Sequence, residues 1–194
     1  MAEIISLPKP NKTGSMPLEQ AIAVRRSRRH FLPKSLTLEQ IGQLAWSAQG
    51  LDEGGRYRTA PSAGATYPLE LFVVTNEDFS RYLPAKHALD KLASQDLRAT
   101  LASAAWGQEF IQTAPLTLVF AAEFSRTTGR YGKRGVRYVY MEAGHAAQNI
   151  HLQAEALGLG SVAVGAFDDA AVSTVLSLPD NLEPIYMVTA GYCR

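Results

Sequence analysis

The run Arg25-Arg26-Ser27-Arg28-Arg29 has the residue types and the spacing of a site that holds an anion. Guanidinium groups bind phosphate oxygens through paired hydrogen bonds, and a neighbouring hydroxyl donates another. An Arg-x-Ser-x-Arg pattern is therefore suited to clamping a phosphate. Two other interpretations stay open: the solvated end of a helix, or a basic patch that serves as an address or binds nucleic acid.

A second segment, from Arg58 to Pro68, reads RTAPSAGATYP and precedes an apolar run. Its Ser62 and Thr66 hydroxyls and the backbone around Gly64 are potential donors to the hydroxyl or phosphate groups of a ligand. The alternative is a tight connection whose proline and glycine serve only the chain geometry. Taken in isolation, the segment favours that alternative.

A third segment, from Gly158 to Phe167, reads GLGSVAVGAF and contains a Gly-x-Gly-x-x-Ala spacing. A dinucleotide-binding turn follows a strand and opens a helix, whereas the order expected here is a helix and then a strand. We therefore reject a dinucleotide fingerprint. Gly165 within an apolar strand still indicates a close approach of the backbone to something flat.

Other catalytic and metal-binding patterns are weak in this sequence. The single Glu-x-x-His, Glu142 to His145, lacks the second copy that a di-iron bundle needs, so we expect His145 to be hydrogen-bonded in the core or at an interface. His151 lies six residues further on and off the face of His145, so the two do not form a zinc pair. We expect no metal site and assign no catalytic side chain.

The elements that must position these segments follow from hydrophobic periodicity and helix caps. The sequence predicts helices over 18–24, 38–49 (after a Thr37 to Gln40 capping box), 85–105 (in one or two pieces), 135–157 and 168–176. It predicts strands over 69–75, 116–122, 161–166 and 184–190, and a long loop over 50–64. Because helices and strands mix without a βαβ rhythm, we expect an α+β fold.

The longest helical signal runs from 135 to 157. Its apolar residues recur at spacings of four and three, which predicts one continuous stripe. We expect either the central core helix or a helix at a dimer interface, or both. The stripe consists of Val136, Tyr140, Ala143, Ala147, Ile150, Ala154 and Leu157.

Composition excludes several classes of protein. The chain has 194 residues, 46% of them hydrophobic, with 19 basic and 18 acidic side chains, which predicts one globular domain, 1–194, with an N-terminal extension over 1–15. The near-neutral charge argues against a broad nucleic-acid-binding face, and no apolar run is long enough for a membrane helix. One cysteine, Cys193, and a start without a signal-peptide pattern favour a cytoplasmic protein.

Taken in order, these segments resemble the nitroreductase family of FMN-dependent oxidoreductases. The resemblance rests on RRSRRHF, APSAGATYPLELFVV, YGKRGVRYVYMEAGHAAQNIHLQAEALGLGSVAVGAF and the final strand near Gly191. PSAGATYP and EAGHAAQN are more similar to the azoline dehydrogenase (SagB-type) branch. The resemblance implies one FMN-binding domain with a central, mostly antiparallel sheet flanked by helices. It also implies an intertwined homodimer with a long central helix and one FMN in each of two interface clefts.

The resemblance implies roles for individual residues as well. The arginine-rich element would hold the phosphate, ribityl chain and pyrimidine edge of FMN with Arg25, Arg26, Ser27 and Arg29. The Pro-Ser segment of the other subunit would contribute Pro61, Ser62, Ala63 and Gly64. The strand facing the flavin ring would supply Ala163, Val164 and Gly165, with a backbone N–H toward the flavin N5. Of the basic C-terminal tail that classical members have, only Arg194 would remain.

Two departures from the family pattern bear on function. Classical members have Asn and Gln where this chain has Ala65 and Tyr67, so a side-chain contact to flavin would be missing. In the azoline-oxidising branch a Lys-Tyr pair is implicated in proton removal. If Arg130 and Tyr131 occupy that place, arginine has replaced the lysine, and arginine does not act as a base at neutral pH.

The activity implied by the resemblance is ping-pong hydride transfer, in which NADH or NADPH reduces FMN and a nitroaromatic, quinone or similar small acceptor takes the electrons. We expect a homodimer with no nucleic-acid or membrane partner. Three alternatives remain. They are oxidation of azoline heterocycles in peptides, a protein that binds or stores flavin without turnover, and nucleic-acid binding through the arginine-rich run.

Overall fold

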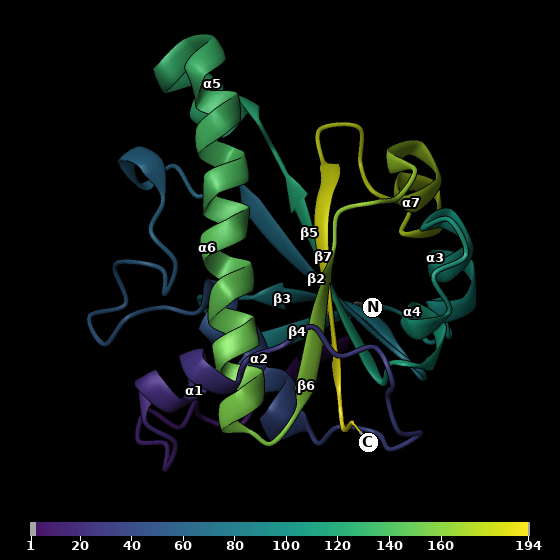
Figure 1. Cartoon of the computed structure of the whole chain (residues 1–194). Coiled ribbons are helices and arrows are strands. Elements are labelled where there is room, and N and C mark those ends of the chain that lie inside the picture. The colour runs from purple at the N-terminus through teal and green to yellow at the C-terminus, as the bar shows by residue number, and fades with distance from the viewer. Residues whose placement is uncertain (1–2, 194) are drawn as a thin grey trace.

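Residues 3–193, the part of the chain that the computed structural model describes, fold around a seven-stranded sheet (Figure 1). The strands lie in the order β1-β4-β3-β2-β5-β7-β6, and every pair of neighbours is antiparallel. The strands are β1 (Glu3–Ser6), β2 (Leu69–Thr75), β3 (Phe79–Leu83), β4 (Ala88–Ala93), β5 (Leu116–Ala122), β6 (Gly160–Val164) and β7 (Glu183–Gly191). The α+β prediction with a mostly antiparallel sheet is confirmed.

Helices cover both faces of this sheet. In Figure 1, α6 crosses one face with α1, α2 and α5 beside it, and α3, α4 and α7 lie on the other face. The helices are α1 (Leu18–Val24), α2 (Leu38–Gln49), α3 (Arg98–Ala104), α4 (Glu109–Thr113), α5 (Ser125–Tyr131), α6 (Gly135–Ala156) and α7 (Asp169–Val175), with single 3₁₀ turns at Ala63–Ala65 and Gly132–Arg134.

Each face of the sheet has its own apolar core, and β5 shows how one strand serves both. All seven residues of β5 are buried. Because successive side chains of a strand point to opposite faces, Leu118 and Phe120 pack on the α6 side, whereas Val119 and Ala121 pack on the side of α3 and α7. Because β5 is buried on both faces, it forms a continuous apolar run in the sequence. The structure confirms its predicted bounds, 116–122.

Helix α2 starts at the predicted position. The Thr37 hydroxyl accepts a hydrogen bond from the Gln40 amide nitrogen at 3.2 Å, and the Gln40 side-chain oxygen accepts one from the Thr37 amide at 3.0 Å. This reciprocal pair satisfies two backbone donors that a helix start leaves free. The capping box is therefore confirmed.

Helix α6 is buried on one side, and its predicted apolar stripe is exposed near the start of the helix. The predicted stripe is buried at Ala143, Ala147, Ile150 and Ala154. Nearer the start of the helix, Val136 is 38% exposed and Tyr140 is 53% exposed, so the stripe leaves the core there. Although α6 has 22 residues, neither it nor any other described helix is long and apolar enough to cross a membrane.

The prediction of helix across 85–105 is wrong for most of that range. The chain forms the β3–β4 hairpin, and only Arg98–Ala104 is helical. Residues 85–93 are rich in helix-forming Ala, Leu and Lys. Tertiary pairing overrides this preference, because β4 has β3 on one side and β1 on the other, with Ile5 opposite Leu89. Strand β1 lies within residues 1–15, where the sequence showed only an extension.

Candidate functional site

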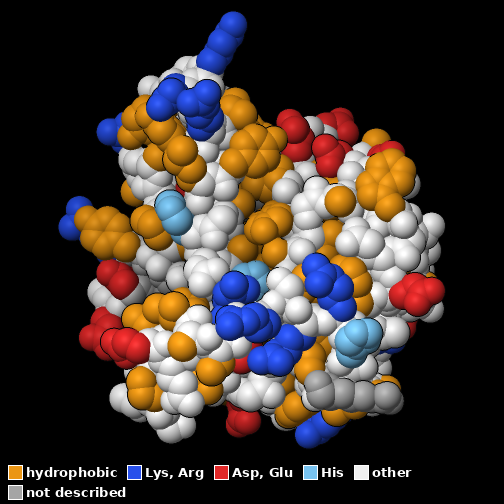
Figure 2. All heavy atoms as spheres, in the orientation of Figure 1, with side chains coloured by type: hydrophobic (Ala, Val, Ile, Leu, Met, Phe, Trp, Pro, Cys, Tyr) orange, Lys and Arg blue, Asp and Glu red, His pale blue; other side chains and the backbone are white. Residues whose placement is uncertain are grey.

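The arginine-rich segment runs along the outer edge of β6. Ser27 forms a parallel bridge with Ser161, and the Arg28 amide donates a hydrogen bond of 3.0 Å to the Ser161 carbonyl. Further on, Phe31 bridges Cys193. Figure 2 shows basic side chains gathered on this face, where the chain leaving α1 passes in front of β6. Backbone pairing to the sheet thus fixes the segment, which is not the frayed end of a helix.

Two arginines of this segment are engaged by the protein itself. The Arg28 Nε lies 3.7 Å from Oε1 of the buried Glu155. The Arg26 Nη1 donates to the carbonyl oxygens of Ala23 and Arg25, at 3.2 Å and 2.7 Å. Arg28 therefore anchors the segment to α6, and Arg26 folds back onto the end of α1.

Arg25 and Arg29, the other two arginines of the segment, form no ion pair within the described residues. Within residues 3–193, neither Arg25 nor Arg29 has a carboxylate partner within 4.0 Å. The Arg29 guanidinium lies over the Phe110 ring of α4, 5.7 Å from its centroid. Two uncommitted guanidinium groups on a fixed backbone are suited to an anionic ligand.

His151 lies beneath this segment and holds Ser161. Its Nδ1 is 2.7 Å from the Ser161 hydroxyl oxygen, and both residues are buried. Burial lowers the pKa of His151 to about 4, and the nearby positive charge of Arg25 adds to the shift. The imidazole is therefore neutral at neutral pH and adds no further charge beneath the arginines. From the sequence we considered His151 only as a possible zinc ligand, and we did not predict its contact with Ser161.

The outer edge of β6 offers backbone donors beyond the bridge. The Ser161 carbonyl faces outward, since it accepts from Arg28. Because backbone groups of a strand alternate in direction, those of Ala163 face outward too. In the register with β7, Ala163 lies opposite Val188 and Val164 lies opposite Met187. Beyond the bridge, Ala163 is therefore the position of β6 whose N–H faces outward, and Gly165 follows directly after the strand.

Gly165 has no side chain although packing leaves room for one. A Cβ atom there would come no closer than 3.6 Å to the Tyr186 ring, an ordinary contact. At Gly160, by contrast, a Cβ atom would collide with Cys193 and with the Arg28 side chain. Gly160 is thus required by the packing of the arginine-rich segment, whereas Gly165 leaves the exposed end of β6 flat toward a ligand.

The Pro-Ser segment, Pro61–Gly64, lies against the other end of α6. The Ser62 Oγ accepts a hydrogen bond of 2.9 Å from the Tyr67 amide. The Arg130 Nη1 donates to the Gly64 carbonyl at 3.2 Å, so α5 closes over this turn. Gly64 has φ +62°, a left-handed conformation that suits glycine.

Ala65 and Tyr67, the two departures from the classical pattern, are also left-handed, with φ of 53° and 48°. The Tyr67 ring has the Arg58 guanidinium over it, 5.3 Å from the centroid. Tyr67 thus contacts a residue of its own chain.

Arg194, the predicted contact to the FMN phosphate at the C-terminus, lies outside the described residues.

Glu142 of α6 lies near the Pro-Ser segment. The sequence analysis did not identify it as a functional candidate outside the metal motif. The residue is 2% exposed, and its Oε1 has no hydrogen-bond partner within residues 3–193. Burial raises the pKa of Glu142 to about 7, opposed by a hydrogen bond from Ser62 and by the charge of Arg58. The signal that was available is its position in α6, next to the buried Ala143.

One chain does not bring the two parts of the predicted flavin site together. The Pro-Ser segment meets α6 at Glu142, whereas the arginine-rich segment meets it at His151 and Glu155. At 1.5 Å per residue, these contacts lie about 14 to 20 Å apart along the helix. Within one chain, the two parts therefore lie at separate places along α6.

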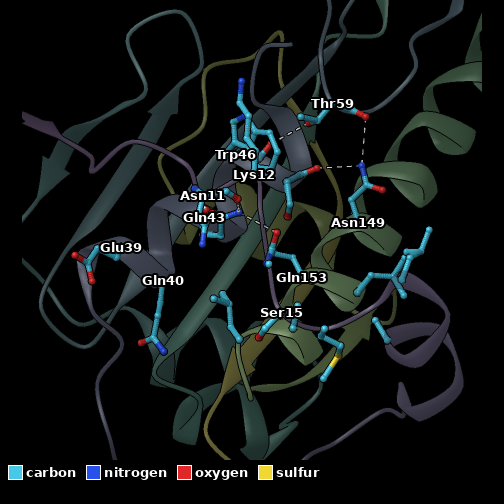
Figure 3. Close-up of a pocket in the computed structure, with 18 of the residues that line it drawn as sticks. Asn11, Lys12, Ser15, Glu39, Gln40, Gln43, Trp46, Thr59, Asn149 and Gln153 are labelled. Carbon is cyan, nitrogen blue, oxygen red and sulfur yellow. Dashed lines mark hydrogen bonds between the residues drawn. The ribbon is translucent and has the colours of Figure 1, made fainter. Parts of the chain in front are cut away.

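A hollow of about 860 Å³ lies elsewhere, between residues 8–16, α2 and the second half of α6 (Figure 3). Gln43 closes its floor, where its side chain hydrogen-bonds both the backbone of Asn11 at 2.8 Å and the side chain of Gln153 at 3.0 Å. None of the predicted flavin-binding residues within 3–193 lines this hollow. Within residues 3–193 no group of three or more His, Cys, Asp or Glu side chains is placed to hold a metal ion.

The residues along β6 fit FMN. The two uncommitted guanidinium groups suit its phosphate, and the outward backbone of Ala163 with the flat Gly165 suits the edge of its ring. The fit rests on donors of the right chemistry: cations for a dianionic phosphate, and N–H groups for ring nitrogen and oxygen atoms.

Comparisons with known proteins establish the family of the chain. The model of the nitroreductase family matches residues 22–192. A nitroreductase homologue of Methanocaldococcus jannaschii is 39% identical over 180 residues, 90% of each chain. The crystal structure of a nitroreductase homologue from Ralstonia eutropha superimposes with a TM-score of 0.89 at 33% identity, covering 98% of this chain and 90% of that one.

A third relative belongs to the azoline branch. The microcin B17-processing protein McbC of Escherichia coli is 28% identical over 153 residues, 73% of this chain and 56% of its own length. The family match spans most of the chain, and its fold is the one described above. The protein is therefore a member of the nitroreductase family, whose members are FMN-dependent oxidoreductases.

Proposed function

We propose that the protein binds one FMN per chain and transfers electrons from NADH or NADPH to a nitroaromatic, quinone or similar small acceptor. The observation that carries the proposal is the bridge between Ser27 and Ser161. It fixes two uncommitted guanidinium groups beside the exposed end of β6, so that one ligand with a phosphate and a flat ring can meet both.

The chain's own part in the reaction is to bind and orient. Arg25 and Arg29 neutralise the phosphate, and the Ser27 hydroxyl is placed between them in sequence. The backbone of Ala163 and Gly165 donates to the ring edge, which leaves one ring face open to donor and acceptor in turn. FMN, when bound, supplies the hydride chemistry, so no nucleophilic side chain is needed.

We also propose a homodimer, in which the Pro-Ser segment of each chain completes the site of the other. The separation of the two parts along α6 supports this, and so does uncovered apolar surface. On α6, Val136 is 38% exposed and Met141 53%; on α1, Leu18 is 59% and Ile22 55% exposed. These side chains lie on two helices of the same face of the sheet, and exposed apolar surface of this kind is typical of a protein interface.

The direct test is to purify the protein and to measure its bound flavin and its thermal unfolding with and without added FMN. The proposal predicts a yellow protein with about one FMN per chain and a higher unfolding temperature when FMN is in excess. A colourless protein that FMN does not stabilise would contradict the proposal.

A second function, oxidation of azoline heterocycles in peptides, is favoured by one contact. Arg130 and Tyr131, the candidate for the Lys-Tyr pair of that branch, lie on the Pro-Ser segment through the bond from Arg130 to the Gly64 carbonyl. Rapid loss of the visible absorbance of bound flavin on adding NADH or NADPH supports the reductase. A flavin that neither nicotinamide reduces, but that an azoline peptide does, supports the dehydrogenase.

A further inference from the structure

A second gathering of basic side chains lies where α5 meets the start of α6, and the proposed binding of FMN makes no use of it. Residues 124–141 contain five basic side chains and no acidic one, although the whole chain has nearly equal numbers of both. All five are exposed: Arg126, Arg130, Lys133, Arg134 and Arg137. Figure 2 shows basic side chains over α5, on the same face of the molecule as those of the arginine-rich segment.

Most of these cations have no counter-charge in the protein. Arg126 is engaged, since it pairs with Glu70 at 2.9 Å and with Glu123 at 2.7 Å. Within residues 3–193, no carboxylate oxygen lies within 4.0 Å of a cationic nitrogen of the other four. Arg130 donates to the Gly64 carbonyl. The last three form what we call the basic patch: Lys133, Arg134 and Arg137.

Hydrogen bonds fix α5, and with it the basic patch, beside the Pro-Ser segment. Besides the bond from Arg130, the hydroxyl oxygens of Thr127 and Thr66 are 2.8 Å apart, and Thr127 is buried. The Arg126 Nη1 donates to the Tyr67 carbonyl at 3.0 Å. The patch therefore has a set place next to the segment that the proposed function assigns to the flavin site.

The turn that carries the patch is closely packed as well. A Cβ atom at Gly135 would come within 2.9 Å of the Thr128 Cα, so a side chain there would push α5 away from α6. The rings of Tyr131 and Tyr138 pack edge to face with their centroids 5.2 Å apart. The Arg134 guanidinium lies 6.0 Å from the centroid of the Tyr138 ring. The cations are thus preorganised, and a ligand that binds them meets little cost of ordering.

The ligand that such a patch fits is a small molecule with a terminal phosphate. Arginine and lysine bind phosphate oxygens, and a phosphate monoester carries nearly two negative charges at neutral pH. A few cations on neighbouring turns neutralise one such group, whereas the long row of phosphates in a nucleic acid requires a broader basic face.

Of the two nicotinamide donors in the proposed function, NADPH has a phosphate monoester and NADH has none. This group is attached to the adenosine ribose, at the far end of the molecule from the nicotinamide ring. A binding site for it belongs outside the part of the cleft where the flavin ring is exposed. The basic patch, which lies on the far side of the Pro-Ser turn from α6, meets that requirement through the contacts of α5.

We propose that the basic patch binds the 2′-phosphate of NADPH and makes NADPH the preferred electron donor. In the proposed homodimer, the patch of each chain serves the flavin site that its own Pro-Ser segment completes. This inference rests on the proposed function, because it assumes that the Pro-Ser segment borders bound flavin.

The test measures the binding of NADP⁺ and NAD⁺, which do not reduce flavin, to the FMN-loaded protein by isothermal titration calorimetry. The wild type is expected to bind NADP⁺ about 10- to 100-fold more tightly than NAD⁺, the effect of a charge-assisted contact. The triple variant Lys133→Gln, Arg134→Gln, Arg137→Gln replaces the charges by polar side chains. It should lose this preference and keep the wild-type affinity for NAD⁺.

A matched pair of single variants separates the patch from the overall charge of the protein. Arg134→Gln is expected to weaken the binding of NADP⁺ alone, whereas Lys86→Gln, at an exposed turn between β3 and β4, should bind both dinucleotides as wild type. Added salt should reduce the wild-type preference, because it screens exposed charges. All variants should keep the wild-type unfolding temperature, since the replaced side chains are exposed.

Three results would overturn the inference: a wild type without preference for NADP⁺, a triple variant that retains the preference, and a triple variant that loses affinity for both dinucleotides equally. The visible absorbance of each sample, read before titration, reports separately on the proposed function. A protein that takes up no FMN contradicts the proposed function, whatever its preference between the dinucleotides.

Discussion

Ser27 pairs with Ser161 in a parallel bridge, which adds the arginine-rich segment to the edge of the sheet. In an extended segment alternate residues face the same side. On this basis we expect Arg25, Ser27 and Arg29 to share one side, whereas Arg28 contacts Glu155. The pairing holds the Arg-x-Ser-x-Arg spacing in place at the edge of β6.

Removing either uncommitted arginine is expected to weaken FMN binding. Arg25→Ala or Arg29→Ala each deletes a charge-assisted contact worth about 1.5 to 3 kcal/mol, which raises the dissociation constant by about 10- to 100-fold. Fluorescence titration of the apoprotein with FMN measures this. Lys86→Ala, at an exposed turn between β3 and β4, is the charge-matched control and should bind as wild type. Equal affinities in all four proteins would show that phosphate binds elsewhere.

Gly160 of β6 and Gly165, just after the strand, are expected to respond differently to alanine. Gly160→Ala brings a Cβ atom within 2.7 Å of Arg28 Cδ, so we expect a loss of stability of about 1 to 3 kcal/mol. Gly165→Ala meets only ordinary contacts, so stability stays near wild type while FMN affinity falls. Chemical unfolding and FMN titration of both variants separate the effects. Wild-type affinity in Gly165→Ala would place the flavin ring away from this strand.

His151 makes stability depend on acid pH. Its pKa is about 4 in the folded protein and 6.5 ordinarily, so the unfolded chain binds the proton more tightly. Its contribution is therefore present above pH 6.5 and is lost as the pH falls toward 4. The difference in unfolding free energy between wild type and His151→Gln should change by up to about 3 kcal/mol over that range. A pH-independent difference would mean that His151 titrates normally.

The contribution of Glu142 to stability has the opposite dependence on pH. Its folded pKa of about 7 exceeds the ordinary 4.5, so the native state keeps a proton that the unfolded chain releases. The stabilisation that it provides is full below pH 4.5 and is lost as the pH rises toward 7. Relative to Glu142→Gln, the wild-type apoprotein should lose up to about 3 kcal/mol of unfolding free energy across this window. Parallel stability curves for the two proteins would refute a raised pKa.

A charge on the exposed side of α6 should separate the proposed dimer. Met141→Glu places a carboxylate among uncovered apolar side chains, and burying it unpaired in an interface is unfavourable. Light scattering after size exclusion is expected to show a monomer with weakened FMN binding. Leu92→Glu, on a side chain of β4 that is 48% exposed, is the control and should match wild type. A monomeric wild type that binds FMN fully would contradict the shared site.

Local signals explain which elements could be predicted from the sequence. The Thr37 capping box defined the start of α2, and the apolar runs of β2 and β5 defined central strands, because each signal lies within the element itself. Strands β1, β3 and β4 lack such signals. They exist because Ile5, Leu89 and Tyr82 pair across the sheet, which depends on distant parts of the chain.

The same limit applies to the candidate site. The spacing of the arginine-rich run is visible in the sequence. Two of its arginines contact residues that are distant in sequence: Arg28 lies near Glu155 of α6, and Arg29 lies over Phe110 of α4. Glu142 appeared only as half of a metal motif. Its burial follows from the loop over 50–64 folding across α6, which no local pattern encodes.

The measurement that tests the central claim most directly is an anaerobic titration of the FMN-loaded protein, followed by visible absorbance. We predict that NADH or NADPH bleaches the bound flavin and that a nitroaromatic or quinone restores its absorbance after the nicotinamide is removed. Flavin that stays oxidised with both nicotinamides, or that no acceptor reoxidises, would contradict the account.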